Sequence, residues 1–322
     1  MKPEQSDGAL RKRFIEPPFS ILNAQSGSWQ QRKKKWLELG IQSELGRDAE
    51  CIIGENDSDY MPSMKSGTSI FDPALCEVMY KWFCPEHGLI IDPFAGGSVR
   101  GIVANSMGYE YLGIELSATQ VAANIEQGKK IIPNKQPIWI QGDSNKVLDD
   151  LFEKSFDMVF SCPPYANLEV YSKHEDDISN MRYDDFLLAY RSIISKTVGQ
   201  LKHGHYAVFV VGDVRDENGY YLDFVSDTKK AFIDSGAGLY NEAILLDPIG
   251  TAMIRANNAM GSKKLVKVHQ NVLCFKKYGA DKALNKKIIV DYINKCDDCG
   301  GRIRRLDNGL RTCEECFKDF PI

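Results

Sequence analysis

Residues 89–98 have the sequence Leu89-Ile90-Ile91-Asp92-Pro93-Phe94-Ala95-Gly96-Gly97-Ser98. The apolar start predicts a short buried strand, and a helical pattern follows at 98–107. Adjacent glycines let a backbone approach a ligand closely, and doubly wound sheets bind ligands at the carboxyl ends of their strands. The spacing differs from G-x-G-x-x-G, which disfavours a dinucleotide site. A tight strand-to-helix turn without a ligand is the alternative interpretation.

The rest of the chain predicts an α/β fold in which strands and helices alternate around a mostly parallel sheet. We expect seven strands, near 89–92, 111–115, 138–141, 156–161, 206–211, 240–246 and 271–277. Helices are expected near 98–107, 117–130, 183–201 and 224–235. About two dozen residues without a convincing helical pattern separate the last two strands, so these should form an antiparallel pair closing one edge. The prediction is a Rossmann-like, three-layer fold with a mixed sheet.

Acidic residues stand at the ends of the first three predicted strands. Asp92 ends the first, Glu115 the second and Asp143 follows the third. The carboxyl ends of neighbouring parallel strands share one edge of a sheet, where Glu115 can accept hydrogen bonds from ribose hydroxyls and Asp143 from an adenine amino group. Each residue alone would more often cap a helix. Together, beside a glycine turn, they favour an adenosyl ligand.

The fourth strand opens into Ser161-Cys162-Pro163-Pro164-Tyr165. Consecutive prolines fix φ, lack N–H groups and hold the preceding residue extended, so their carbonyls point outward without a partner in the sheet. A rigid row of acceptors beside an aromatic ring suits a flat heterocycle that carries an amine, such as a nucleobase turned out of its stack.

These two motifs resemble those of one family. Residues 92–98 resemble the AdoMet-binding motif of amino-methyltransferases that act on DNA, and 162–165 resemble their catalytic motif, in which Asp, Asn or Ser precedes Pro-Pro-Tyr. The resemblance covers roughly residues 66–277, and 17–41 further resemble the opening of methylases found in phages and prophages. It implies a class I AdoMet-dependent methyltransferase that modifies N6 of adenine or N4 of cytosine.

The resemblance also implies roles for individual residues. The catalytic residues would be Ser161, Cys162, Pro163, Pro164 and Tyr165, with Tyr165 stacking on the base. S-adenosylmethionine would be bound by Ser69, Phe71, Asp92, Phe94, Ala95, Gly96, Gly97, Ser98, Glu115 and Asp143. Ser69 and Phe71 belong to a segment that resembles the one packing on the methionine part of the cofactor.

Cys162 departs from the family pattern, since a thiol is a weak acceptor and a thiolate needs an activating environment. Three interpretations follow. The backbone carbonyls suffice and Cys162 fills space, or Ser161 supplies a hydroxyl after a local shift, or activity has been lost. Covalent attack as in cytosine C5 methyltransferases is disfavoured, because their cysteine follows the prolines.

Two basic segments are candidates for nucleic-acid contact. The run at 32–37 follows Trp29 at near-helical spacing, so its indoles either anchor a helix on the main domain or form a phosphate-binding patch with the cations. The second segment, which is basic and rich in amides, lies between the last two strands and contributes Arg255, Asn257, Asn258, Lys263, Lys264, Lys267 and His269. It could contact phosphates and base edges, or be a solvated hairpin.

Four of the nine cysteines form two C-x-x-C pairs near the C-terminus, Cys296 with Cys299 and Cys313 with Cys316. Paired knuckles at this spacing fit tetrahedral zinc, which predicts a small ribbon with a structural Zn²⁺. We therefore expect an N-terminal arm with a basic helix and loop (1–65), a methyltransferase domain (66–277), a linker (278–295) and a zinc ribbon (296–322). Residues 1–15 are expected to be loosely attached.

The chain as a whole predicts a cytoplasmic protein, because residues 1–13 lack an apolar leader and no apolar run is long enough to cross a bilayer. A formal net charge of −4 argues against coating a long polyanion and leaves local contact with DNA open. The partner expected is DNA with a flipped base. An RNA base methyltransferase, or a non-catalytic regulator that binds nucleic acid, are the alternatives.

Overall fold

The computed structural model describes residues 6–42, 45, 71–151, 155–164, 178–250 and 252–279, and three short strands nearer the C-terminus. The chain divides into two compact units, Met1–Lys277 and Tyr278–Ile322. Among the described helices, none combines the length and apolar character needed to cross a membrane.

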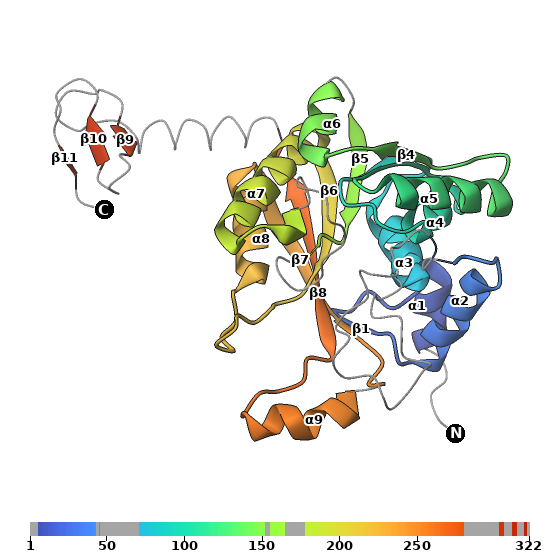
Figure 1. Ribbon diagram of the computed structural model, residues 1–322. Helices are drawn as coiled ribbons and strands as arrows, with labels where there is room; N and C mark the ends of the chain where they lie inside the picture. The colour runs from blue at the N-terminus through green and yellow to red at the C-terminus, as the bar shows by residue number, and fades with distance from the viewer. Residues whose placement is uncertain are drawn as a thin grey trace. The chain divides into compact units, whose positions relative to one another are not determined.

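The first unit is a Rossmann-like α/β structure around one mixed sheet (Figure 1), in the strand order β1-β7-β8-β6-β5-β2-β3-β4. The strands are β1 (Ile21–Asn23), β2 (Leu89–Asp92), β3 (Glu110–Glu115), β4 (Ile138–Gln141), β5 (Phe156–Ser161), β6 (Leu201–Val211), β7 (Ala237–Leu246) and β8 (His269–Lys277). Neighbouring strands are parallel, except that β8 is antiparallel to both β6 and β7. The antiparallel pair predicted at the end of the domain is therefore confirmed.

The helices are α1 (Ser6–Phe14), α2 (Gly27–Leu37), α3 (Pro73–Phe83), α4 (Val99–Ser106), α5 (Ala118–Ile131), α6 (Ser144–Asp150), α7 (Tyr183–Gln200), α8 (Phe224–Asp234) and α9 (Ala252–Gly261). A 3₁₀ turn, η3 (Ile178–Asn180), precedes α7. Helices α3, α4 and α5 cover one face of the sheet and α7 and α8 the other, which gives the three layers predicted (Figure 1).

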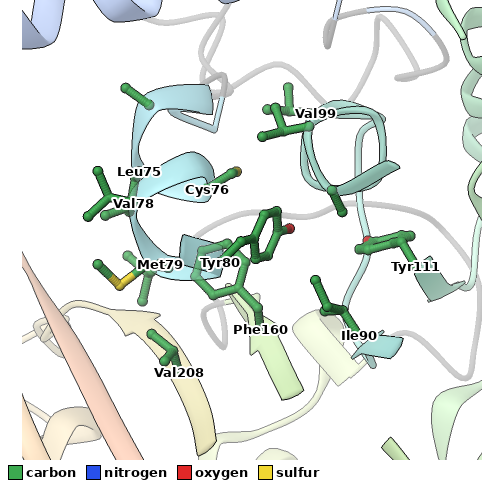
Figure 2. Close-up of a cluster of buried hydrophobic side chains, with 14 of the residues drawn as sticks. Leu75, Cys76, Val78, Met79, Tyr80, Ile90, Val99, Tyr111, Phe160 and Val208 are labelled. Atoms are coloured by element: carbon green, nitrogen blue, oxygen red, sulfur yellow. The ribbon is translucent and has the colours of Figure 1, made fainter. Parts of the chain in front are cut away.

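Strand alternation divides the apolar side chains between two cores. In β6, Val208 and Val210 face the first core while Ala207 and Phe209 face the second. Figure 2 shows the first core, where side chains of α3 pack on Phe160 and Val208 of the sheet. Each large apolar side chain buried this way stabilises the fold by about 1.5–3 kcal/mol. The sheet between the cores is thus a rigid support for the residues at its ends.

The sheet has eight strands, so the expected number of seven was wrong. The additional strand is β1, which pairs in parallel with β7 through the register Leu22 to Leu245. It consists of three residues, too few for an alternating pattern to stand out in the sequence. Its pairing brings the N-terminal segment onto the edge that β7 and β8 were expected to close.

The described part of the N-terminal segment, residues 6–15, is packed, which corrects the expectation of a loose arm for that part of residues 1–15. Residues 6–14 form α1, and the Trp82 indole donates a 2.7 Å hydrogen bond to the Phe14 carbonyl. In α2, Trp29 is buried and its Nε1 donates to Asp72, while Trp36 Nε1 donates to Glu77.

The cations of α2 take part in the same contact. Arg32 lies 2.7 Å from Glu77 and Lys33 lies 3.5 Å from Asp72. Since these ammonium and guanidinium groups pair with carboxylates of the main domain, the structure favours the anchoring role of this helix over a phosphate-binding patch.

The second unit contains a small antiparallel sheet in the order β11-β10-β9. Its strands are β9 (Ile303–Arg305), β10 (Arg311–Cys313) and β11 (Asp319–Phe320). Cys313 ends β10 and pairs with Ile303, whereas Cys296, Cys299 and Cys316 lie outside the described residues. No group of metal-ligating side chains is found among the side chains that the structure describes. The zinc ribbon stays a prediction.

Candidate active site

The candidate site lies between β2 and β5, where the order of the strands changes direction. From β2 the chain continues outward to β3 and β4 on one side of the sheet, whereas β5 and β6 lie on the other side of β2. Chains leaving β2 and β5 therefore diverge, and such a point outside the carboxyl ends of parallel strands is the usual ligand site of a doubly wound sheet. Asp92 and Ser161 end these two strands.

Asp92 is fully buried and is surrounded by donors of the protein itself. Its Oδ1 accepts from the Phe94 amide at 3.1 Å and from Ser161 Oγ at 2.5 Å. Its Oδ2 accepts from Arg100 Nε at 2.5 Å and from the Tyr111 hydroxyl at 2.7 Å. A buried carboxylate is tolerated because it is paired and hydrogen-bonded in this way. Asp92 consequently joins strands β2, β3 and β5 and helix α4.

Arg100 is the counter-ion of Asp92 and also binds the backbone carbonyls that precede the glycine turn. Its Nη2 donates to the carbonyl of Phe94 at 2.6 Å and of Ala95 at 2.8 Å, and its guanidinium lies 4.6 Å from the centre of the Phe71 ring. Burial lowers the pKa of Arg100, but the Asp92 carboxylate outweighs burial and holds the pKa above its ordinary value. Sequence reasoning missed this residue; its one indication was a lone cation in the otherwise uncharged helix α4.

The glycine turn faces the end of β3. Gly96 has φ +52°, and among the described residues a Cβ there would come within 4 Å only of Arg100 Nη2, at 4.0 Å, so these residues leave the outer side of the turn open. The Gly96 amide donates to Glu115 Oε2 and the Ser117 amide to Glu115 Oε1, both at 2.8 Å. Asn124 Nδ2 donates to the Gly96 carbonyl at 2.8 Å. The turn and the Glu115 carboxylate are therefore held as one unit.

Two further predicted residues have structural partners. Asp143 is the N-cap of α6 and accepts from the Asn145 amide at 2.9 Å, and the neighbouring Ser144 hydroxyl donates to the Pro93 carbonyl at 2.5 Å. Ser98 is buried, with its hydroxyl 3.2 Å from Gln127 Oε1. The end of β4 is thus tied to the glycine turn, and Asp143 keeps a partly exposed carboxylate at this edge.

The segment after β5 is described as far as Pro164. Ser161 and Pro163 are buried, Cys162 and Pro164 are half-buried, and Cys162 packs against the first core. Ser161 donates its hydroxyl hydrogen to Asp92, and the side chain is fully buried, so a substrate amine would reach the lone pairs of its oxygen only after a local shift. Ser69 and Tyr165 lie outside the described residues. Phe71 is half-buried and meets Phe160 edge to face at 5.7 Å.

The predicted nucleic-acid contacts are distributed along the connection from β7 to β8, which contains a helix, α9, where none was expected. Arg255 and Lys263 are exposed, Lys264 and His269 half-buried. Lys267 turns inward: its ammonium lies 3.4 Å from the Asp213 carbonyl, and burial lowers its pKa. Since β7 runs parallel to β2 and β5, this connection leaves the sheet at the edge that holds Asp92 and Ser161.

The described residues fit an adenosyl ligand. The open turn at Gly96 offers close backbone approach, Glu115 and Asp143 place two carboxylates at neighbouring strand ends, and the Phe71 ring lies beside Arg100 under the turn. Carboxylates accept from ribose hydroxyls and amino groups, which is the donor set an adenosine presents.

Comparison with known proteins gives similarity of fold. No protein-family model and no curated protein matches the sequence. Among solved structures, TrmN from Thermus thermophilus is 11% identical, with 64% of this chain and 48% of that chain covered and a TM-score of 0.43. A protein of Pyrococcus horikoshii, provisionally described as an RNA methyltransferase, is 14% identical, with 77% and 100% covered and a TM-score of 0.46.

A third similar structure, also from Thermus thermophilus, is provisionally described as a DNA modification methylase. It is 22% identical, with 43% of this chain and 52% of that chain covered and a TM-score of 0.33. The present chain therefore spans about half the length of TrmN and of this methylase. These similarities concern the arrangement of sheet and helices, and the substrates named for those proteins are no argument for the substrate of this chain.

Proposed function

We propose that the protein is an AdoMet-dependent methyltransferase that modifies an exocyclic amine of a base in DNA. The observation that carries the proposal is the hydrogen bond from Ser161 to Asp92. It fastens the end of β5 to the end of β2, so the Cys162-Pro163-Pro164 segment and the glycine turn start from neighbouring strand ends. A donor bound at the turn and an amine bound at the prolines would be neighbours.

On the cofactor side, Glu115 would accept from the ribose and Asp143 from the adenine amino group, while the open turn at Gly96 would lie against the methionine part. When bound, AdoMet supplies an electrophilic methyl group on a sulfonium. The protein would orient this methyl group toward the amine. Holding two reactants in line lowers the activation free energy by on the order of 7–11 kcal/mol in the best intramolecular cases.

On the amine side, the lone pair of an exocyclic amine is delocalised into the ring and is a poor nucleophile. The Pro163 carbonyl and an acceptor at position 162 would take hydrogen bonds from the amine hydrogens and favour a tetrahedral nitrogen. Methyl transfer would exchange the S–C bond for an N–C bond, and one amine proton would leave to water. Tyr165 would stack on the base.

DNA is proposed as the substrate because the β7–β8 connection brings cations to the same edge of the sheet, with Arg255 and Lys263 exposed. Phosphate contacts of this kind position a duplex without reading it.

A non-catalytic regulator is the second candidate, and a specific observation favours it. Position 162 is a thiol, and the only nearby hydroxyl in the described segment, on Ser161, is fully buried. A protein with these features could retain the cofactor site without turnover.

The deciding experiment incubates the protein with AdoMet and either DNA or RNA, followed by mass spectrometry of the released nucleosides. N6-methyladenine or N4-methylcytosine from DNA supports the proposal. Product from RNA alone would replace DNA by RNA as substrate. AdoMet binding without product on any tested polymer would favour the regulator.

A further inference from the structure

Helix α9 exposes its large apolar side chains, which a packed helix would bury. Of its residues only Ala252 is buried, and the larger apolar side chains stand in solvent: Met253 is 74% exposed, Ile254 69% and Met260 50%. Figure 1 shows α9 standing off the sheet, apart from the helices that cover its faces. Helices in globular proteins are held by their packed face, so this one lacks the usual support within the described chain.

The sequence of α9 places its small and large residues on opposite faces. Ala252, Ala256 and Ala259 recur at helical spacing. Ala252 is buried, Ala259 half-buried and Ala256 exposed, so the alanine face is covered only near its two ends. Asn257 shares a stripe with Met253 and Met260 at positions i, i+4 and i+7. Ile254 and Asn258 form the adjoining stripe. The outward face therefore combines amide groups with apolar side chains.

The sequence in and directly after α9 is positively charged. From Pro248 to Ala280 it contains no Asp or Glu, and Arg255, Lys263 and Lys264 lie in the helix or just after it. Lys267 faces Asp213 and Asp247, and Lys276 and Lys277 lie at the far end of β8. The whole chain has a formal net charge of −4, so this segment differs sharply from the rest. A cationic setting complements a polyanion and argues against a second copy of an acidic chain as the occupant of the face.

We propose that α9 enters the major groove of duplex DNA and reads base edges with Asn257 and Asn258, with Arg255 and Lys263 on the flanking phosphates. This rests on the proposed function for its choice of DNA. A ten-residue helix is about 15 Å long and fits a groove about 12 Å wide. Asparagine pairs with N6 and N7 of adenine, and Met253 or Ile254 can contact a thymine methyl group, so the sequence selected should contain A·T pairs.

Position supports the assignment. The helix connects β7 to β8 at the edge of the sheet where Cys162-Pro163-Pro164 lies. A helix docked in the groove here would hold the duplex against the edge that takes the target base.

The first test measures duplex binding by fluorescence anisotropy at several salt concentrations. Arg255→Ala and Lys263→Ala should each weaken binding to all sequences and reduce the slope of log K against log salt by about 1. The matched control is Lys230→Ala, an exposed cation on α8, with Ile138→Ala as an exposed apolar control at the start of β4. All of these side chains are exposed, so melting temperatures should match the wild type.

The second test selects bound sequences from a duplex library with a randomised centre. The wild type should enrich a motif that contains adenine, and the double variant Asn257→Ala with Asn258→Ala should bind its best sequence roughly 5- to 150-fold more weakly while its affinity for random duplex stays unchanged. The variant Met253→Ala with Ile254→Ala should lose preference at thymine positions.

The outcomes separate this inference from the proposed function. If the wild type methylates DNA and the α9 variants select and methylate the same sequence, the groove-reading role is wrong and the activity stands. If the wild type transfers no methyl group but its duplex binding depends on α9, the activity is wrong and the role of α9 stands. The role would also be wrong if the α9 variants weakened the binding of RNA but not of DNA. It would be wrong as well if light scattering showed that the variants dissociate a dimer while their DNA affinity is unchanged.

Discussion

The hydroxyl of Ser161 donates a 2.5 Å hydrogen bond to the buried carboxylate of Asp92. These residues are 69 positions apart and end the two strands that meet at the switch in strand order. The bond makes the segment after β5 and the turn after β2 parts of one rigid arrangement. It also assigns Ser161 a positioning role, because its hydroxyl hydrogen is directed into the protein.

Replacing Ser161 by alanine should therefore affect folding and cofactor binding together. Asp92 would lose one of four donors in a buried site, which costs about 1–3 kcal/mol of unfolding free energy. AdoMet affinity should fall as well. Denaturant unfolding and calorimetric titration measure both. Thr197→Val is the matched control, a buried hydroxyl of α7 bonded at 2.7 Å to the Ile193 carbonyl, and should leave AdoMet affinity unchanged. An unaltered affinity in Ser161→Ala would contradict the positioning role.

Arg100→Met should be more damaging, because it leaves Asp92 as a buried charge without its counter-ion and frees the carbonyls of Phe94 and Ala95. Breaking a buried pair on one side costs about 3–5 kcal/mol. The double variant Arg100→Met with Asp92→Asn should recover part of that loss in denaturant unfolding.

The control for Arg100 is Arg191→Met, which removes a partly exposed ion pair with Asp227 and should cost under about 1 kcal/mol. Equal stabilities of the two single variants would show that the Asp92 pair is dispensable.

The positions of Asp92, Glu115 and Asp143 were predictable because they depend on local pattern. Each follows a short apolar run, and parallel strands bring their carboxyl ends together whatever the details of packing. Arg100 was not predictable, since its partners are two carbonyls and a carboxylate that become neighbours only in the folded turn. A residue that donates to backbone groups leaves no pairing pattern in the sequence.

Among the elements that were missed, β1 and α9 were missed for different physical reasons. Strand β1 is stabilised by pairing with β7, more than 200 residues away along the chain, and its three residues carry little propensity of their own. Helix α9 inverts the usual pattern by turning alanines inward, so a search for an apolar buried stripe does not find it. Its large apolar residues are exposed at the surface that is proposed to bind DNA, so the rule that apolar residues are buried does not apply there.

Asp157 lies near the start of β5, at the end of the strand away from the candidate site. Acid should lower the stability of the fold through this residue. Burial opposes its ionisation, but hydrogen bonds from Lys202 at 2.7 Å and from the Leu89 amide at 3.0 Å outweigh burial and lower the pKa of Asp157. A lowered pKa stabilises the fold above the ordinary Asp value, about 3.9, and that contribution is lost as the pH falls through the lower folded-state value.

Melting temperatures of the wild type and Asp157→Asn should accordingly differ at neutral pH and converge below about pH 4. The exposed Lys202 partner limits the pair's share to about 1 kcal/mol. Asp149→Asn, which removes a more exposed ion pair with Lys196, should change the melting temperature little at neutral pH. A difference for Asp157→Asn that persists unchanged into acid would exclude this linkage.

The C-terminal cysteines are expected to hold one zinc ion. Thiolate ligands are required, so Cys296→Ser or Cys313→Ser should lower bound zinc from one equivalent toward zero in metal analysis of the purified chain. Cys76→Ser is the control, because Cys76 is buried in α3 and burial raises its thiol pKa well above the ordinary value. Zinc content that is the same in all variants would refute the ribbon.

Position 162 decides between catalysis by main-chain carbonyls and loss of activity. Cys162 is half-buried and packs against the first core, as expected of a side chain that fills space. If the carbonyls are the acceptors, Cys162→Ala should keep turnover within about threefold, since a lost thiol contact is worth less than one hydrogen bond, about 0.5–1.5 kcal/mol. Cys162→Asp should be no faster, whereas a gain of an order of magnitude or more would show that the missing acceptor limits the natural protein. Single-turnover methylation of duplex DNA, at saturating AdoMet, separates these outcomes from changes in binding.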